Sequence, residues 1–169
     1  MRFMTTDTKK FNLAVLASQD ACFDLQFRKD TRHERTNAPT YYRWKAQFII
    51  TGTKDALPVM QRVKRELACG NVHRNKNQVR FSVQNLSEII EVVIPYFQKN
   101  LLSGNKKKDF EFWQKAVAIM YQNKGKHLAA WKKNDLHSLI ELQKLSAKYK
   151  TKTREPRWIA MAQTLAKSL

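Results

Sequence analysis

Apolar and polar positions change their spacing several times along the chain, and each change marks an expected element. Helical spacing alternates with stretches of period two, in which apolar side chains point to one face of a strand. The expected elements in chain order are helix 9–19, a strand from Ala21, strand 41–51, helix 54–68, strands 71–75 and 78–84, and helices 87–98, 107–123, 126–149 and 156–168. This order predicts an α+β fold in which two hairpins form one four-stranded antiparallel sheet.

The four predicted strands divide their side chains in the same way, with apolar residues on one face and polar, largely basic residues on the other. The helices can cover the apolar face, which leaves the polar face open. A β-ribbon fits the major groove of DNA, and alternating side chains can reach base edges. We therefore expect contacts to double-stranded DNA from Asp24, Gln26, Arg28, Asp30, Arg32, Arg43, Lys45, Gln47, His73, Asn75, Arg80 and Ser82. The alternative is an ordinary solvated sheet face.

Composition changes the picture in one respect, the identity of the partner. The 169 residues include 32 Lys+Arg and 14 Asp+Glu, a net charge of +18. Such an excess favours a polyanion, and nucleic acid is the first candidate because neutralised phosphates release counterions. An anionic membrane surface would require a long basic amphipathic helix. A lysine far from the strands, such as Lys150, is expected to bind phosphate without regard to sequence.

Several classes of protein are poor interpretations. No apolar run reaches the roughly 18 residues of a membrane span, so we expect no membrane partner. The N-terminus lacks an apolar signal segment, which predicts an intracellular protein. Cys22 and Cys69 are far apart and no CxxC pair exists, which argues against zinc fingers and disulfide scaffolds.

One segment at the end of the first helix carries a more specific signal. LAVLASQDACF, Leu13 to Phe23, resembles the motif of the LAGLIDADG homing endonucleases, L-A-G-F-(I/V)-D-(G/A)-(D/E)-G-S-F. The segment LLSGNKKKDFEFW is similar to the family's lysine and Asp-Phe box, and the order of elements extends the resemblance over residues 11–120. The chain departs from the pattern at Val15, Ser18 and Ala21, and at Gly52, near which some members hold a glutamine that organises water.

The resemblance implies an αββαββα core over residues 1–125, with a helical extension over 126–169 packed on it. It also implies a nuclease that makes a double-strand break at a long pseudo-palindromic site. Because only one motif is present, the resemblance implies a homodimer whose motif helices pack closely. The small or apolar residues expected in that seam are Leu13, Ala14, Ala17, Ser18 and Ala21.

The resemblance assigns the active site as well. Asp20, with the backbone carbonyl of Gln19, would hold Mg²⁺, for which Ca²⁺ is a non-catalytic substitute. Lys106 would stabilise charge on the phosphate, although Lys107 or Lys108 could take its place after a one-residue slip. Gln47 is a candidate substitute for the missing glutamine.

The departures from the motif favour a second hypothesis, a catalytically weak or inactive relative that acts as an RNA maturase or a DNA-binding regulator. RNA is an expected partner only in that case. Retention of Asp20 favours the nuclease. If the gene lies within an intron, an organellar location, in a chloroplast or mitochondrion, is expected.

Overall fold

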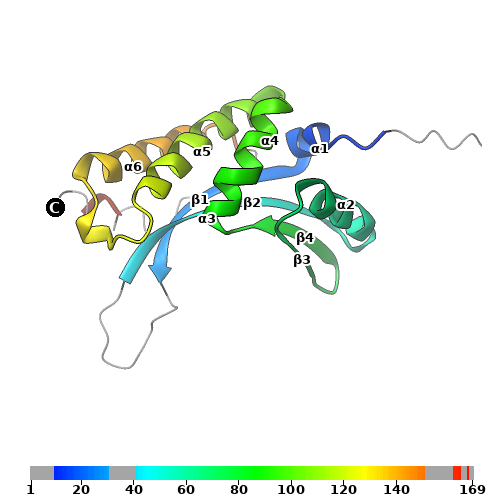
Figure 1. The fold of residues 1–169 in the computed structure, drawn as a ribbon, viewed down its shortest axis with the longest axis horizontal. Coiled ribbons are helices and arrows are strands. Elements are labelled where there is room, and N and C mark those ends of the chain that lie inside the picture. Colours follow the sequence, from blue (N-terminus) through cyan, green and yellow to red (C-terminus); the bar gives the residue numbers. More distant parts are fainter. Residues whose placement is uncertain (1–9, 31–40, 151–161, 165–166, 168–169) are drawn as a thin grey trace, which may run out of the picture.

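The computed structural model describes residues 10–30, 41–150, 162–164 and 167. Its centre is a four-stranded antiparallel sheet in the order β1-β2-β4-β3, with α4, α5 and α6 on one side of it (Figure 1). The elements are α1 Leu13–Asp20, β1 Ala21–Asp30, β2 Tyr41–Thr53, the 3₁₀ turn η1 Lys54–Ala56, α2 Leu57–Leu67, β3 Asn71–Arg74, β4 Gln78–Val83, α3 Leu86–Glu88, the π-helical turn η2 Ile89–Val93, α4 Ile94–Lys99, α5 Gly104–Gln122, the 3₁₀ turn η3 Leu128–Ala130 and α6 Lys133–Ala147. The predicted α+β architecture with one antiparallel sheet is confirmed.

Some predicted helix bounds are wrong for local reasons. The first helix begins at Leu13 rather than residue 9, because the side chain of Asn12 caps it by accepting a bond from the Val15 amide at 3.2 Å. The predicted helix 126–149 is a 3₁₀ turn followed by α6, which starts only at Lys133. Of the predicted helix 156–168, residues 162–164 and 167 are described and helical.

Aromatic side chains fill the space between the sheet and the helices. The ring of Phe23 in β1 lies 5.2–5.8 Å, centroid to centroid, from those of Phe48, Phe97, Phe110 and Trp113. Leu136, Leu139 and Ile140 of α6 belong to the same buried core. The C-terminal helix therefore shares its core with the rest of the chain.

Strand β1 lies at one edge of the sheet, where unpaired carbonyl groups need partners. Side chains from the C-terminal half supply them. The bonds run from Lys106 Nζ to the Ala21 carbonyl, from Lys150 Nζ to Phe23 at 2.7 Å, from Trp113 Nε1 to Asp24 at 3.0 Å, and from Gln143 Nε2 to Leu25 at 2.9 Å. The C-terminal half thus completes the edge of the sheet.

Strand β2 is longer than its partner β4. The two pair only over Phe48–Thr53 of β2, which leaves the part from Tyr41 to Gln47 without a strand on that side among the described residues. Its other side pairs with β1 along its whole length up to Ile50. The β1–β2 hairpin therefore extends as a two-stranded arm beyond the end of β4.

Candidate nucleic-acid interface

The junction between α1 and β1 places a carboxylate at a helix end. Asp20 is the last residue of α1 and is exposed, and Ala21 turns the chain into the extended conformation of β1. The C-terminal end of a helix carries partial negative charge on its last carbonyl groups. A carboxylate at this end makes the junction a place where a cation is favoured.

Lys106 is the member of the lysine trio that reaches this junction. Its Nζ donates a hydrogen bond to the carbonyl of Ala21, one residue after Asp20. Lys107 and Lys108 are exposed, whereas Lys106 is half-buried. The structure therefore brings Lys106 to the residue that follows Asp20, and it distinguishes Lys106 from its two exposed neighbours.

Ser18 explains how α5 is held against α1. Its hydroxyl donates to the Ala14 carbonyl at 2.7 Å and accepts the backbone amide of Ser103 at 3.0 Å. Ser103 is the residue that precedes α5, the helix that carries Lys106. The serine at the family's acid position thus provides the acceptor that fixes the start of α5 beside α1.

The predicted small-residue seam needs correction. Leu13, Ala17 and Ala21 are almost fully buried in the chain's own core, so they cannot contact a second copy directly. Ala14 is buried and Ser18 is half-buried. The exposed side chains of α1 are instead those of Val15, Gln19 and Asp20, and Val15 is 54% exposed.

The polar face of the sheet carries a hydrogen-bonded chain across three strands. Gln47 Nε2 donates to Asp24 Oδ2 at 3.0 Å, and Arg80 Nη2 donates to Gln47 Oε1 at 3.4 Å. Gln47 is only 4% exposed. It pairs with Asp24 along the sheet, whereas Ile50 pairs with Ala21. Gln47 thus lies within the sheet face and is not brought to Asp20 and Lys106.

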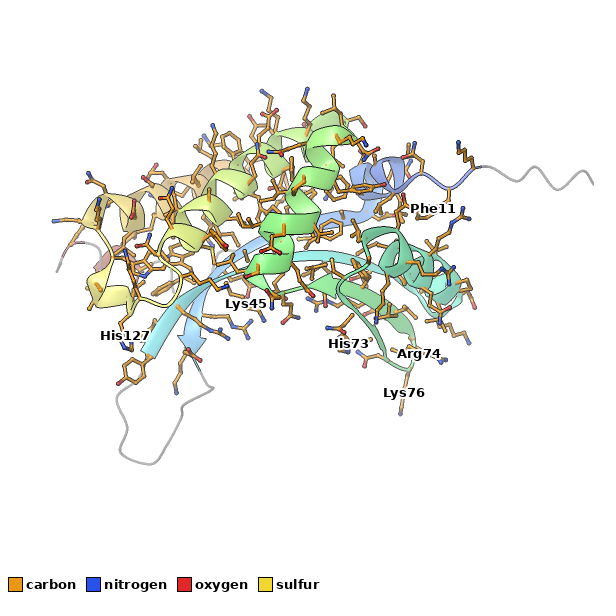
Figure 2. The ribbon with its side chains drawn as sticks, in the orientation of Figure 1. Phe11, Lys45, His73, Arg74, Lys76 and His127 are labelled. Atoms are coloured by element: carbon orange, nitrogen blue, oxygen red, sulfur yellow. The ribbon has the colours of Figure 1, made fainter. Side chains whose placement is uncertain are left out.

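Positive charge is concentrated on the same face. Partial burial lowers the pKa of Lys45, and the cations Arg28, Arg43 and Arg80 lower it further. Its Nζ is held by Gln84 Oε1 at 2.9 Å. Figure 2 shows Lys45 and His73 on the side of the sheet away from α4 and α5. Because like charges crowd Lys45, a bound polyanion would favour its charged form.

The predicted DNA contacts differ in their availability. Gln26, Arg28, His73 and Asn75 are exposed; Asp24, Asp30, Arg43, Lys45 and Arg80 are half-buried. Ser82 is only 2% exposed, and Arg32 lies outside the described residues. Gln84 was not among the predicted DNA contacts. It follows Arg80 and Ser82 at the same spacing of two residues, so this spacing could have placed it on the polar face.

Lys150 is not the free lysine that its position in the sequence suggested. Its Nζ lies 3.1 and 3.0 Å from the two carboxylate oxygens of Asp109. Asp109 is fully buried, and burial raises its pKa while Lys150 opposes the rise. The pair joins the C-terminal segment to α5, so the expectation of non-specific phosphate binding by Lys150 is corrected.

No group of three or more His, Cys, Asp or Glu side chains that could hold a metal occurs in the described part of the chain. The oxygen donors at the α1–β1 junction, Asp20 and the Gln19 carbonyl, are nevertheless of the kind that Mg²⁺ takes. Mg²⁺ is usually held by one or two carboxylates together with water and substrate phosphates. The donor set of one chain therefore fits half of such a site.

The fold and the junction define a class of protein. The sequence profile described as LAGLIDADG endonuclease matches residues 16–117. The chain belongs to the LAGLIDADG endonuclease family, whose members hydrolyse phosphodiester bonds. No described helix is both long and apolar enough to span a membrane.

Individual relatives add detail. The chain is 24% identical over 93 residues to "Probable intron-encoded endonuclease 3" of Neurospora crassa. The aligned region spans 54% of this chain and 17% of that protein. Among solved structures, the homing endonuclease I-TnaI superposes with a TM-score of 0.70 at 17% identity, covering 91% of this chain and 95% of that one. I-SmaMI bound to an uncleaveable DNA superposes with a TM-score of 0.64 at 26% identity, covering 84% of this chain and 45% of that one. I-SmaMI bound to uncleaved DNA with calcium ions superposes with a TM-score of 0.70 at 17% identity, covering 91% of this chain and 50% of that one.

Proposed function

We propose that this chain is a site-specific DNA endonuclease that acts as a homodimer with Mg²⁺. The observation that carries the proposal is the hydrogen bond from Lys106 Nζ to the Ala21 carbonyl, one residue after Asp20, next to a sheet whose polar face is crowded with cations. An acid of the kind that holds a metal and a lysine that can stabilise charge on a phosphate therefore belong to one junction at the end of a basic sheet.

The incomplete donor set supports the homodimer. One chain offers one carboxylate at the junction, and Val15, Gln19 and Asp20 form the exposed face of α1. If the α1 helices of two copies face each other, two Asp20 carboxylates come together. These like charges would repel unless a divalent cation lay between them. This fold covers 95% of the I-TnaI chain but only 50% of the I-SmaMI chain. The half coverage of I-SmaMI agrees with an enzyme that needs two such units.

Each group then has a chemical task. Asp20 and the Gln19 carbonyl would hold Mg²⁺, which activates water and stabilises the departing 3′ oxygen when it is bound. Lys106 would stabilise negative charge on the phosphate. The exposed polar residues of β1 and β3, such as Gln26, Arg28 and His73, would read bases, and their neighbouring cations would hold the backbone.

One observation favours the alternative of a weak or inactive relative that works as an RNA maturase or DNA-binding regulator. Gly52 stands near the position where some members hold a glutamine, and a Cβ there would lie 2.8 Å from Cβ of Ala56 and 3.1 Å from Cε of Met60. A larger side chain does not fit without a shift of α2 or its preceding turn. Gly52 therefore cannot supply the side chain that organises water in those members.

The test uses DNA that joins the sequences flanking the gene, incubated with the full chain in Mg²⁺ and separately in Ca²⁺. The proposal expects cleavage in Mg²⁺ and binding without cleavage in Ca²⁺. Tight specific binding without cleavage in either metal would point to a regulator. Binding to the corresponding intron RNA without binding to the DNA would point to a maturase.

A further inference from the structure

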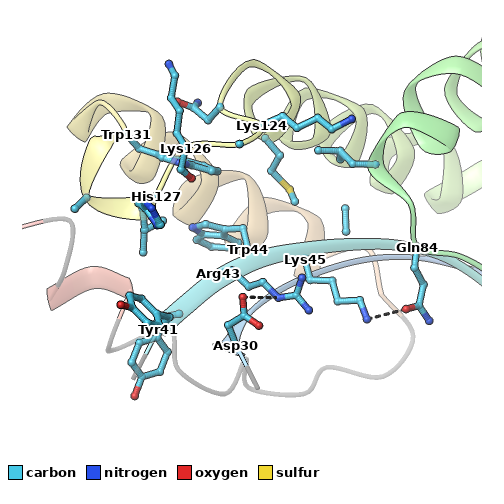
Figure 3. Close-up of a pocket in the computed structure, with 18 of the residues that line it drawn as sticks. Asp30, Tyr41, Arg43, Trp44, Lys45, Gln84, Lys124, Lys126, His127 and Trp131 are labelled. Atoms are coloured by element: carbon cyan, nitrogen blue, oxygen red, sulfur yellow. Dashed lines mark hydrogen bonds and ion pairs between the residues drawn. The ribbon is translucent and has the colours of Figure 1, made fainter. Parts of the chain in front are cut away.

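A cleft lies beside the part of β2 that has no partner in β4. It has a volume of about 1060 Å³ and is bounded by β2 residues Tyr41 to Ala46, by Gln84 to Leu86, and by the segment from Asn123 to Trp131. Figure 3 shows Lys126, His127 and Trp131 on one side of it and Tyr41, Arg43 and Lys45 along β2 on the other. The cleft exists because β4 ends at Val83 and the α5–α6 connection passes over the uncovered part of β2.

The walls of the cleft are positively charged. Lys45, Lys124 and Lys126 line it together with His127, and Asp30, the one acid among the described lining residues, lies 3.7 Å from Arg43 Nε. Lys45 and Lys124 are held by Gln84 at 2.9 Å and Ser87 at 2.5 Å, whereas Lys126 is exposed. A lining with several cations and few acids favours an anionic ligand.

Flat side chains are the second feature of the lining. Tyr41 is 49% exposed, His127 is exposed, and Trp131 is half-buried with its Nε1 donating to the Lys126 carbonyl at 3.4 Å. The indole is therefore oriented while part of it stays accessible. Aromatic faces next to backbone-binding cations are the combination that holds unpaired bases.

We propose that this cleft binds single-stranded nucleic acid, at a site that adjoins the polar face of the sheet and shares Arg43 and Lys45 with it. Its volume lies just above the ~300–1,000 Å³ typical of small-ligand pockets, which suits a few nucleotides. Tyr41, His127 and Trp131 stack on bases, and Lys126 and Lys45 hold phosphates. The site does not depend on Asp20 or on cleavage.

The experiment measures fluorescence anisotropy of labelled ten-nucleotide oligothymidylate and oligouridylate with the full chain. Tyr41→Ala removes an exposed stacking face, and Lys126→Gln removes an exposed charge. Each has a control outside the lining, Leu101→Ala and Lys64→Gln, both of exposed residues. Thermal unfolding of all four variants confirms that they fold.

We expect Tyr41→Ala to weaken oligonucleotide binding by at least about fivefold, because stacking on one aromatic side chain contributes that much or more. Lys126→Gln should weaken it and flatten the salt dependence, and both controls should stay within twofold. Preference for oligothymidylate or for oligouridylate assigns the bound strand as DNA or RNA, and either result supports the site.

Three results would overturn the proposal. Equal binding by the cleft variants and the controls would remove the cleft from the interaction. Competition by a random duplex at equal nucleotide concentration, with the same sensitivity to both variants, would make the cleft part of a duplex footprint. Displacement by polyglutamate as effective as by unlabelled oligonucleotide, with no effect of Tyr41→Ala, would assign it to an acidic peptide.

Discussion

A few side-chain hydrogen bonds at the α1–β1 junction determine where the candidate catalytic groups lie. Asp20 is exposed because α1 ends there, and Lys106 points to the next residue because its Nζ bonds to the Ala21 carbonyl. Ser18 holds the start of α5 through the Ser103 amide, so it positions Lys106 indirectly. Ser18 stands where the family motif has an acid, and its hydroxyl still accepts the hydrogen bond from the amide at the start of α5.

The three adjacent lysines allow a matched comparison at this scale. Lys106→Met should lower the rate of DNA cleavage by about 100-fold or more, because a preorganised charge near the phosphate is lost. Lys107→Met should change the rate by less than threefold, since Lys107 is exposed and has no contact at the junction. The measurement is single-turnover cleavage at saturating protein. Equal losses for the two variants would contradict the assignment of Lys106.

At the scale of elements, the C-terminal half stabilises the edge of the sheet. Lys106, Trp113, Gln143 and Lys150 all donate to carbonyl groups of β1, and α6 buries Leu136, Leu139 and Ile140 against the same core. An uncovered edge strand is a template for pairing with other chains. Helices α5 and α6, with Lys150 beyond α6, therefore protect β1, and both helices also fill the core.

The buried ion pair between Asp109 and Lys150 predicts a pH-dependent loss of stability. Lys150→Ala should lower the free energy of unfolding by roughly 3 kcal/mol at pH 7, because a fully buried carboxylate loses its cation. Burial already raises the pKa of Asp109, and removal of the cation that opposes the rise must raise it further. The folded variant then binds more protons than its unfolded chain, so its stability falls as pH rises through that pKa.

Urea unfolding at pH 4 and pH 7 measures this effect. The deficit of Lys150→Ala relative to the unmodified chain should be larger at pH 7, and a second change, Asp109→Asn, should recover part of it. Lys148→Ala, at an exposed position two residues away, serves as the control. A deficit that is the same at both pH values, or that Lys148→Ala reproduces, would show that the pair has no such role.

The strands could be predicted from sequence within two or three residues, because period two is a local property. The contact between Asp109 and Lys150 could not, since 41 residues separate them and both resemble ordinary surface charges. Helical spacing in α1 showed that Leu13, Ala17 and Ala21 share an apolar character, but not that the chain's own core would bury them. The cleft beside β2 depends on where β4 ends relative to the α5–α6 connection, which no local pattern records.

At the scale of the whole molecule, the described residues form one four-stranded sheet of this fold, and the chain has a net charge of +18. Its polar sheet face, its junction acid and its lysine together form half of the proposed nuclease. The exposed face of α1 is where a second half would join, and Val15 is its most exposed apolar side chain. In the proposed homodimer, assembly and catalysis would therefore be coupled through the same short helix.

This coupling predicts a specific effect of a charge in the seam. Val15→Arg should shift the mass in sedimentation equilibrium from about 40 kDa, twice the 19.9 kDa of one chain, toward the monomer, and should abolish cleavage with it. Val59→Arg places the same charge on α2 at a valine that is 38% exposed, and should leave the dimer intact. A monomeric unmodified chain at micromolar concentration, with and without DNA, would rule out the two-fold active site.

Replacing Asp20 by Asn is the sharpest test of the proposed active site, because it keeps the shape of the side chain and removes its charge. Cleavage of the target in Mg²⁺ should fall by at least about 100-fold, since the metal loses its carboxylate. DNA affinity in Ca²⁺ should change little, because the phosphate and base contacts lie on the sheet. Asp55→Asn, at an exposed acid in the turn η1, should cleave normally. Equal cleavage by the unmodified chain and Asp20→Asn would contradict the account.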